Sequence, residues 1–139
     1  MEVRDTRLLG LDIGDSRIGV ALSDPLGILA SPLTIINRTD EEAYIKAIIA
    51  LIRQHQVGRV IAGLPISMDN SLGKQAEKTR DFVKALCRNT KVPVEFRDER
   101  LSTVSAKRLV QEVRKTSGKT RYDAMAAAVI LQGYLDEAL

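Results

Sequence analysis

Cysteine and histidine are almost missing from this chain of 139 residues, which has one of each and no tryptophan. The single cysteine, Cys87, excludes an internal disulfide and any zinc site built on several cysteines. Because Cys87 falls in a helical pattern, we expect it to be a small packing residue. The single histidine excludes a histidine-rich metal centre. A metal site in this chain would therefore rest on oxygen ligands.

Long apolar runs are also missing. No run approaches the ~18 residues of a membrane-spanning helix, and no signal-peptide pattern opens the chain, so we expect a cytoplasmic protein. The chain has 21 basic and 18 acidic residues and a net charge of +3. This mildly basic balance permits a phosphate-rich partner without identifying one. The length predicts a single domain over residues 1–139.

One carboxylate, Asp12, interrupts the apolar segment Leu8–Asp24, LLGLDIGDSRIGVALSD. Apolar residues on both sides of the break at Gly14–Arg17 predict a β-hairpin with Asp12 near the end of its first strand. A charge there is costly unless it is paired, hydrated or bound to a metal. The alternative interpretation is an aspartate that only accepts amide hydrogens of the turn.

The rest of the chain alternates between strand and helix patterns. A third strand over 28–36 completes an antiparallel meander, and its Pro32 suits an edge strand. Two further strands each follow a helix pattern, so both are expected to run parallel to the first strand. We expect these strands at 58–65 and 92–97, and helices at 40–56, 74–88, after a cap at Ser102 or Thr103, and at 121–138.

This order predicts an α/β fold. One mixed five-stranded sheet, with three antiparallel strands followed by two parallel strands, is expected to carry helices on both faces. The helix over 74–88 is rich in charged residues, so we expect it to be exposed.

Carboxylates from three distant segments are expected at one edge of this sheet. Asp12 lies near the end of the first strand, Asp98 and Glu99 follow the fifth strand, and Asp123 lies in the first turn of the last helix. Ligands of open α/β sheets gather at the carboxyl ends of parallel strands. Two carboxylates ~4 Å apart repel by roughly 4 kcal/mol at an effective dielectric constant of about 20, so such a cluster needs a cation. All-oxygen ligands favour Mg²⁺ or Mn²⁺, and a pair of such ions can hydrolyse a phosphodiester.

Four motifs then resemble the signature blocks of one family. They are GLDIGDSRIGVALSD (10–24), GLPISMDNSLGKQA (63–76), DERLST (98–103) and DAMAAAVIL (123–131). Together they make the chain similar to the YqgF/RuvX family of RNase H-like proteins, described as Holliday-junction resolvase-like proteins or pre-16S rRNA nucleases. The resemblance covers nearly the whole chain and implies an RNase H-like fold. Asn70-Ser71 and Met125 depart from the expected pattern, and neither departure removes an acid.

The resemblance implies a catalytic site of three acids. The family's strand aspartate corresponds to Asp12, its late-strand acid to Glu99 and its helical aspartate to Asp123. These residues are then both catalytic and ligands of Mg²⁺ or Mn²⁺, with two ions expected. Basic residues near the motifs are candidate nucleic-acid contacts, although a solvated charge is the plainer interpretation of each alone. These candidates are Arg17, Lys74, Arg100, Lys119 and Arg121.

The leading hypothesis is a metal-dependent nuclease that acts on structured nucleic acid, by resemblance in 5′-end processing of pre-16S rRNA. A Holliday junction resolvase is the alternative enzyme, which needs a symmetric dimer to cut two strands. A non-catalytic RNA-binding or nucleotide-binding module is the alternative of another class. The expected partner is pre-16S rRNA or branched DNA, with the ribosome as a candidate context and no membrane. The chain is expected to be a monomer or a weak homodimer.

Overall fold

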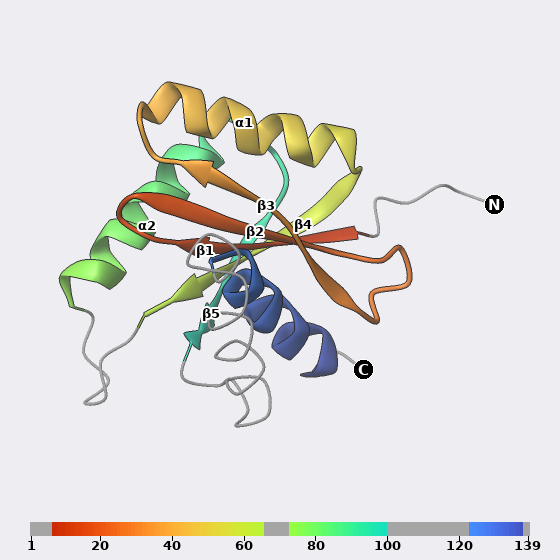
Figure 1. The fold of residues 1–139 in the computed structure, drawn as a ribbon. Coiled ribbons are helices and arrows are strands. Elements are labelled where there is room, and N and C mark those ends of the chain that lie inside the picture. Colours follow the sequence, from red (N-terminus) through yellow and green to blue (C-terminus); the bar gives the residue numbers. More distant parts are fainter. Residues whose placement is uncertain (1–6, 66–72, 100–122, 138–139) are drawn as a thin grey trace.

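The computed structural model describes residues 7–65, 73–99 and 123–137. Its elements are β1 (Arg7–Ile13), β2 (Arg17–Ser23), β3 (Ala30–Asn37), α1 (Glu41–Gln54), β4 (Val57–Leu64), α2 (Lys74–Cys87) and β5 (Val94–Asp98). Residues 123–137 form a further helix, called here the C-terminal helix and drawn in blue in Figure 1. Among the described residues, no helix is long and apolar enough to cross a membrane.

The five strands form one sheet in the order β3-β2-β1-β4-β5. β1, β2 and β3 are antiparallel neighbours, whereas β4 and β5 run parallel to β1. The predicted strand directions and the predicted mixed sheet are therefore confirmed. β3 lies at an edge, as Pro32 predicted, and the register between β2 and β3 shifts at Val20/Ala21, next to the residue that pairs with Pro32.

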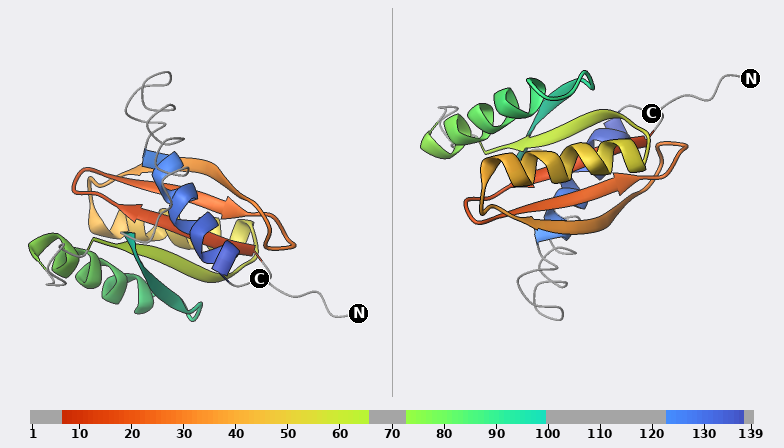
Figure 2. Two further views of the ribbon diagram at one scale, coloured as in Figure 1. Left: turned by 90° about the horizontal axis from the view of Figure 1, so that it is seen from below. Right: turned by 90° about the horizontal axis from the view of Figure 1, so that it is seen from above.

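Helices cover both faces of the sheet, as the alternating pattern predicted. α1 and α2 lie on one face and the C-terminal helix crosses the other, as the two views of Figure 2 show. Each face has its own buried core. The core under the C-terminal helix is built on Ala127, Ala128, Ile130 and Leu131. Its alanines let the helix approach the sheet closely. The approach leaves no room for a side chain at Gly10 of β1, where a Cβ would lie 2.8 Å from the Cβ of Leu131.

α1 follows from its sequence. The side chain of Asp40 accepts a hydrogen bond from the backbone N–H of Ala43 at 3.2 Å, which caps the helix. Ile45, Ile48 and Ile52 recur at helical spacing and are buried.

The prediction that the helix over 74–88 is exposed was wrong. Six residues of α2 are buried, because Phe82, Val83 and Leu86 enter the core that α1 shares. Phe82 also stacks on Tyr44 of α1, with ring centroids 5.4 Å apart. The prediction that Cys87 is a packing residue was wrong as well, since it lies exposed at the last residue of α2.

The third strand begins two residues later than predicted. The carboxylate of Asp24 accepts hydrogen bonds from the backbone N–H groups of Ile28 and Leu29, at 2.7 and 2.8 Å. These bonds close a turn over the residues expected to begin the strand, so β3 starts at Ala30. The helix expected after Ser102 or Thr103 lies outside the described residues.

Candidate functional site

The sheet topology brings three acidic segments to one edge. Asp12 is the penultimate residue of β1, and Asp98 ends β5, with Glu99 directly after it. β1 and β5 lie on either side of β4 and run in the same direction, so their carboxyl ends share an edge. Asp123 is the first described residue of the C-terminal helix. All three predicted acids, Asp12, Glu99 and Asp123, are half-buried.

Asp12 and Glu99 are in direct contact through a hydrogen bond between their side chains. Two carboxyl groups can share such a bond only when one of them carries a proton. Burial, the charge and hydrogen bond of Glu99, and the charge of Asp123 together raise the pKa of Asp12 to about 7, with burial as the largest cause. Asp12 therefore senses both other acids.

The pKa of Glu99 is shifted in both directions by its surroundings. Burial raises its pKa, the hydrogen bond from Asp12 lowers it, and the charge of Asp98 raises it, with a net shift upward. Desolvation is the first cause for both Asp12 and Glu99, so the fold holds two carboxyl groups in a place that disfavours their ionised forms. A cation placed between them would remove this penalty.

Two glycines make the cluster possible. Gly19 pairs with Asp12 across β1 and β2, and a Cβ at Gly19 would lie 1.9 Å from the backbone oxygen of Asp123. At Gly63 a Cβ would lie 2.8 Å from Oε1 of Glu99. A side chain at either place would push an acid-bearing segment away from Asp12. Both glycines lie within strands, where glycine is a signal of close backbone approach, so the sequence carries a signal for them.

Asp123 already has a cationic partner. Nε of Arg17, the first residue of β2, donates to Oδ2 of Asp123 at 2.7 Å. This ion pair joins the hairpin to the C-terminal helix, 106 residues later in the chain. Arg17 was predicted as a nucleic-acid contact, and the structure places its guanidinium at the edge of the acid cluster.

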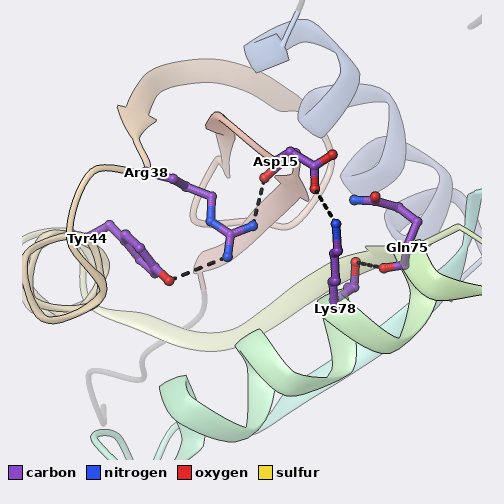
Figure 3. A network of polar contacts seen from close by, with 7 residues as sticks. Asp15, Arg38, Tyr44, Gln75 and Lys78 are labelled. Carbon is purple, nitrogen blue, oxygen red and sulfur yellow. Dashed lines mark hydrogen bonds and ion pairs between the residues drawn. The ribbon is translucent and has the colours of Figure 1, made fainter.

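Residues near α1 and α2, on the face of the sheet away from the C-terminal helix, brace the β1–β2 turn, as Figure 3 shows. Nη1 of Arg38 donates to the backbone oxygen of Gly14 at 2.8 Å, and the backbone N–H of Arg38 donates to that of Ser16 at 2.9 Å. The guanidinium of Arg38 also lies over the ring of Tyr44, 5.2 Å from its centroid. Lys78 of α2 forms an ion pair with Asp15 at 3.5 Å. The two hydrogen bonds of Arg38 fix the turn that separates Asp12 from Arg17, whereas the exposed pair of Lys78 and Asp15 adds little.

The donor chemistry of the acids suits Mg²⁺ or Mn²⁺. Asp12, Glu99 and Asp123 offer carboxylate oxygens, the ligands these hard ions prefer. As they stand, the described His, Cys, Asp and Glu residues include no group of three arranged to hold a metal ion. The ion pair with Arg17 occupies Oδ2 of Asp123, while Asp12 and Glu99 face each other. Oδ1 of Asp123 is not part of this ion pair, so Asp123 could bind an ion while it keeps Arg17.

The profile of the family described as RuvX, Holliday junction resolvase, matches residues 6–137. The chain belongs to this family. Its relatives include proteins named "Putative pre-16S rRNA nuclease": that of Dehalococcoides mccartyi is 48% identical over 90% of this chain and 94% of its own length. The protein of the same name from Halothermothrix orenii is 47% identical over 94% of each chain.

Solved structures show the fold that RuvX family members share with resolvases. Thermus thermophilus RuvC in complex with a Holliday junction substrate superimposes with a TM-score of 0.65, at 14% identity over 96% of each chain. The fowlpox virus resolvase, bound to Holliday junction DNA, superimposes with a TM-score of 0.60, at 12% identity over 96% of this chain and 99% of its own. The RNase H-like sheet predicted from the motifs is thereby confirmed.

The basic residues predicted as nucleic-acid contacts have different outcomes in this RuvX family member. Lys74 is exposed at the first residue of α2, after the segment that follows β4, and Arg17 is engaged with Asp123. Arg100, Lys119 and Arg121 lie outside the described residues. The sequence reasoning missed Arg38, whose contacts come from segments that are not adjacent in the chain and carry no local signal.

Proposed function

We propose that this chain is a divalent-metal-dependent nuclease that hydrolyses phosphodiester bonds of structured RNA in 5′-end processing of pre-16S rRNA. The observation that carries the proposal is the hydrogen-bonded pair of Asp12 and Glu99 beside Asp123. A protein that only bound RNA would need lysine or arginine side chains at this edge to contact phosphates, not half-buried carboxylates. Three acids held together at a cost are instead typical of a cation site.

In this proposal Asp12, Glu99 and Asp123 hold Mg²⁺ or Mn²⁺, with two ions as the expected number. The bound metal supplies an activated water and stabilises the charge that develops on the phosphate oxygens. If a cation bound between Asp12 and Glu99, Asp12 would lose to solvent the proton that it shares with Glu99. Arg17, whose guanidinium pairs with Asp123, would donate to a phosphate oxygen of the substrate, and Lys74, exposed at the start of α2, would contact the nucleic-acid backbone.

The choice of RNA rests on the names of the relatives, which cover this chain almost completely. A cytoplasmic location and a monomer or weak dimer are part of the same proposal. The second candidate is resolution of branched DNA, which the family description names. That reaction requires paired cuts on two strands and therefore a symmetric dimer.

Cleavage assays distinguish the two candidates. The protein is incubated with Mn²⁺ and, separately, with a precursor 16S rRNA 5′ fragment, a four-way DNA junction, and linear RNA and DNA. We expect cleavage of the rRNA fragment by wild type and none by Asp12→Asn. The matched control is Asp15→Asn, which changes an exposed aspartate on the adjacent turn and should retain activity. Paired cuts in the four-way junction, with the rRNA fragment intact, would favour the resolvase.

A further inference from the structure

A groove lies far from the acids, where α1 and α2 end. It has a volume of about 740 Å³. Apolar side chains from both helices and the segment before β5 form part of its lining, among them Ile49, Ile52 and Val92. Because α1 precedes β4 and α2 precedes β5, the groove lies at the amino ends of these strands. It is therefore at the opposite end of the strands from Asp12 and Glu99.

The charge around this groove has one sign. Arg53, Arg88 and Lys91 line it, and no aspartate or glutamate is among its lining residues. All three basic side chains are exposed, and none forms an ion pair with a described residue. The carboxyl ends of two helices contribute only about half a negative charge each, so the three cations leave a net positive groove.

Edge strand β5 connects the groove to the acids. Lys91 comes before β5 and Glu99 directly after it, and the eight steps along the chain from Lys91 to Glu99 span at most roughly 26 Å. Phe96 lies between these two ends and is 41% exposed. Side chains alternate along a strand, and Val94 packs in the core under α1 and α2, so Phe96 points to the face that carries α2. An exposed aromatic ring can stack on a nucleobase.

We propose that the groove of Arg53, Arg88 and Lys91 binds the phosphate backbone of a single-stranded RNA flank that runs from the acid cluster along β5, past Phe96. This inference rests on the proposed function, because it names how the substrate is held. Stacked nucleotides advance about 3.4 Å each, so the flank must extend about eight nucleotides from the acids to reach the groove. Shorter flanks do not reach it.

Binding of RNAs of two lengths tests this path. The RNAs carry single-stranded flanks of about three or about twelve nucleotides on both sides of the cleavage site, below and above the reach of the groove. Their affinity is measured by fluorescence anisotropy over a range of salt, in the Asp12→Asn background to prevent cleavage. The test variant is Arg53→Gln, Arg88→Gln and Lys91→Gln together. The control is Lys46→Gln, Arg80→Gln and Lys84→Gln, which removes equal charge from exposed residues outside the groove.

We expect the groove variant to bind the long RNA ~100-fold more weakly at about 0.1 M salt, with a salt slope lower by about 2 for three lost contacts. The control variant should bind it nearly as the parent does, and the short RNA should bind all variants alike. Phe96→Ala should weaken binding of the long RNA roughly tenfold.

Unchanged affinity of the groove variant for the long RNA would overturn the proposal. Equal losses in the groove and control variants would overturn it too, since net charge alone would then explain them. A loss that is the same for short and long RNA, or no effect of Phe96→Ala, would refute the path along β5. Because binding is measured without cleavage, a failed nuclease assay leaves this test intact, and active cleavage with unaltered RNA binding would overturn only the groove.

Discussion

Replacing Asp12 by asparagine should make the metal-free protein more stable at neutral and alkaline pH. The pKa of Asp12 rises from 3.8, the ordinary value of an aspartate side chain, to about 7 in the folded protein. Folding therefore takes up a proton between these pH values, and the free energy of unfolding of the wild type falls as pH rises through this window. The shift corresponds to at most about 4 kcal/mol.

The variant Asp12→Asn escapes this loss, and its amide can still donate a hydrogen bond to Glu99. Asp12 and Glu99 share the proton, so not all of the shift belongs to Asp12. We therefore expect the free energy of unfolding of Asp12→Asn to exceed that of wild type by about 2–4 kcal/mol at pH 8, and by almost nothing below pH 4. Urea unfolding of wild type and variant in EDTA, at a series of pH values, measures it. Asp15→Asn is the control, because it makes the same substitution at an exposed aspartate of the adjacent turn. An Asp12→Asn variant no more stable than wild type at pH 8 would refute the reasoning.

Four further outcomes follow from the same site. Mg²⁺ or Mn²⁺ at 100 times its dissociation constant should stabilise wild type by about 2.7 kcal/mol, seen as a higher melting temperature that Asp12→Asn lacks. Gly63→Ala should lower the free energy of unfolding by about 1–3 kcal/mol in urea, because its Cβ would lie 2.6 Å from Ile130 Cδ1 and 2.8 Å from Glu99 Oε1. Gly19→Ala should cost more, because the clash there is with the backbone. Arg17→Ala should lower the free energy of unfolding by about 1 kcal/mol through loss of its pair with Asp123, a difference that salt should reduce.

Local patterns in the sequence were sufficient for the sheet and for the placement of the acids. The hairpin around Asp12, the cap at Asp40 and the parallel strands follow from short-range signals and from the rules of strand connection. The burial of α2 was missed because its charged residues outnumber an apolar face of Phe82, Val83 and Leu86 at helical spacing, which packs into the core and on Tyr44 of α1.

Contacts between distant segments were also beyond local reasoning. The pair of Arg17 and Asp123 joins residues 106 apart, and the groove arises only where α1 and α2 end side by side. The roles of Gly19 and Gly63 could be predicted only in part. Glycine within a strand signals a close approach, but the sequence does not say which segment approaches.

The central claim is that Asp12, Glu99 and Asp123 together form one cation site. Calorimetric titration of Mn²⁺ into wild type and into Asp12→Asn, Glu99→Gln and Asp123→Asn tests it most directly, with Asp15→Asn as the control. We expect wild type and the control to bind Mn²⁺ alike, each of the other three variants to bind it at least tenfold more weakly, and all of them to remain folded. Undiminished Mn²⁺ binding by any one of the three variants would contradict the claim for that acid, and undiminished binding by all three would contradict the site.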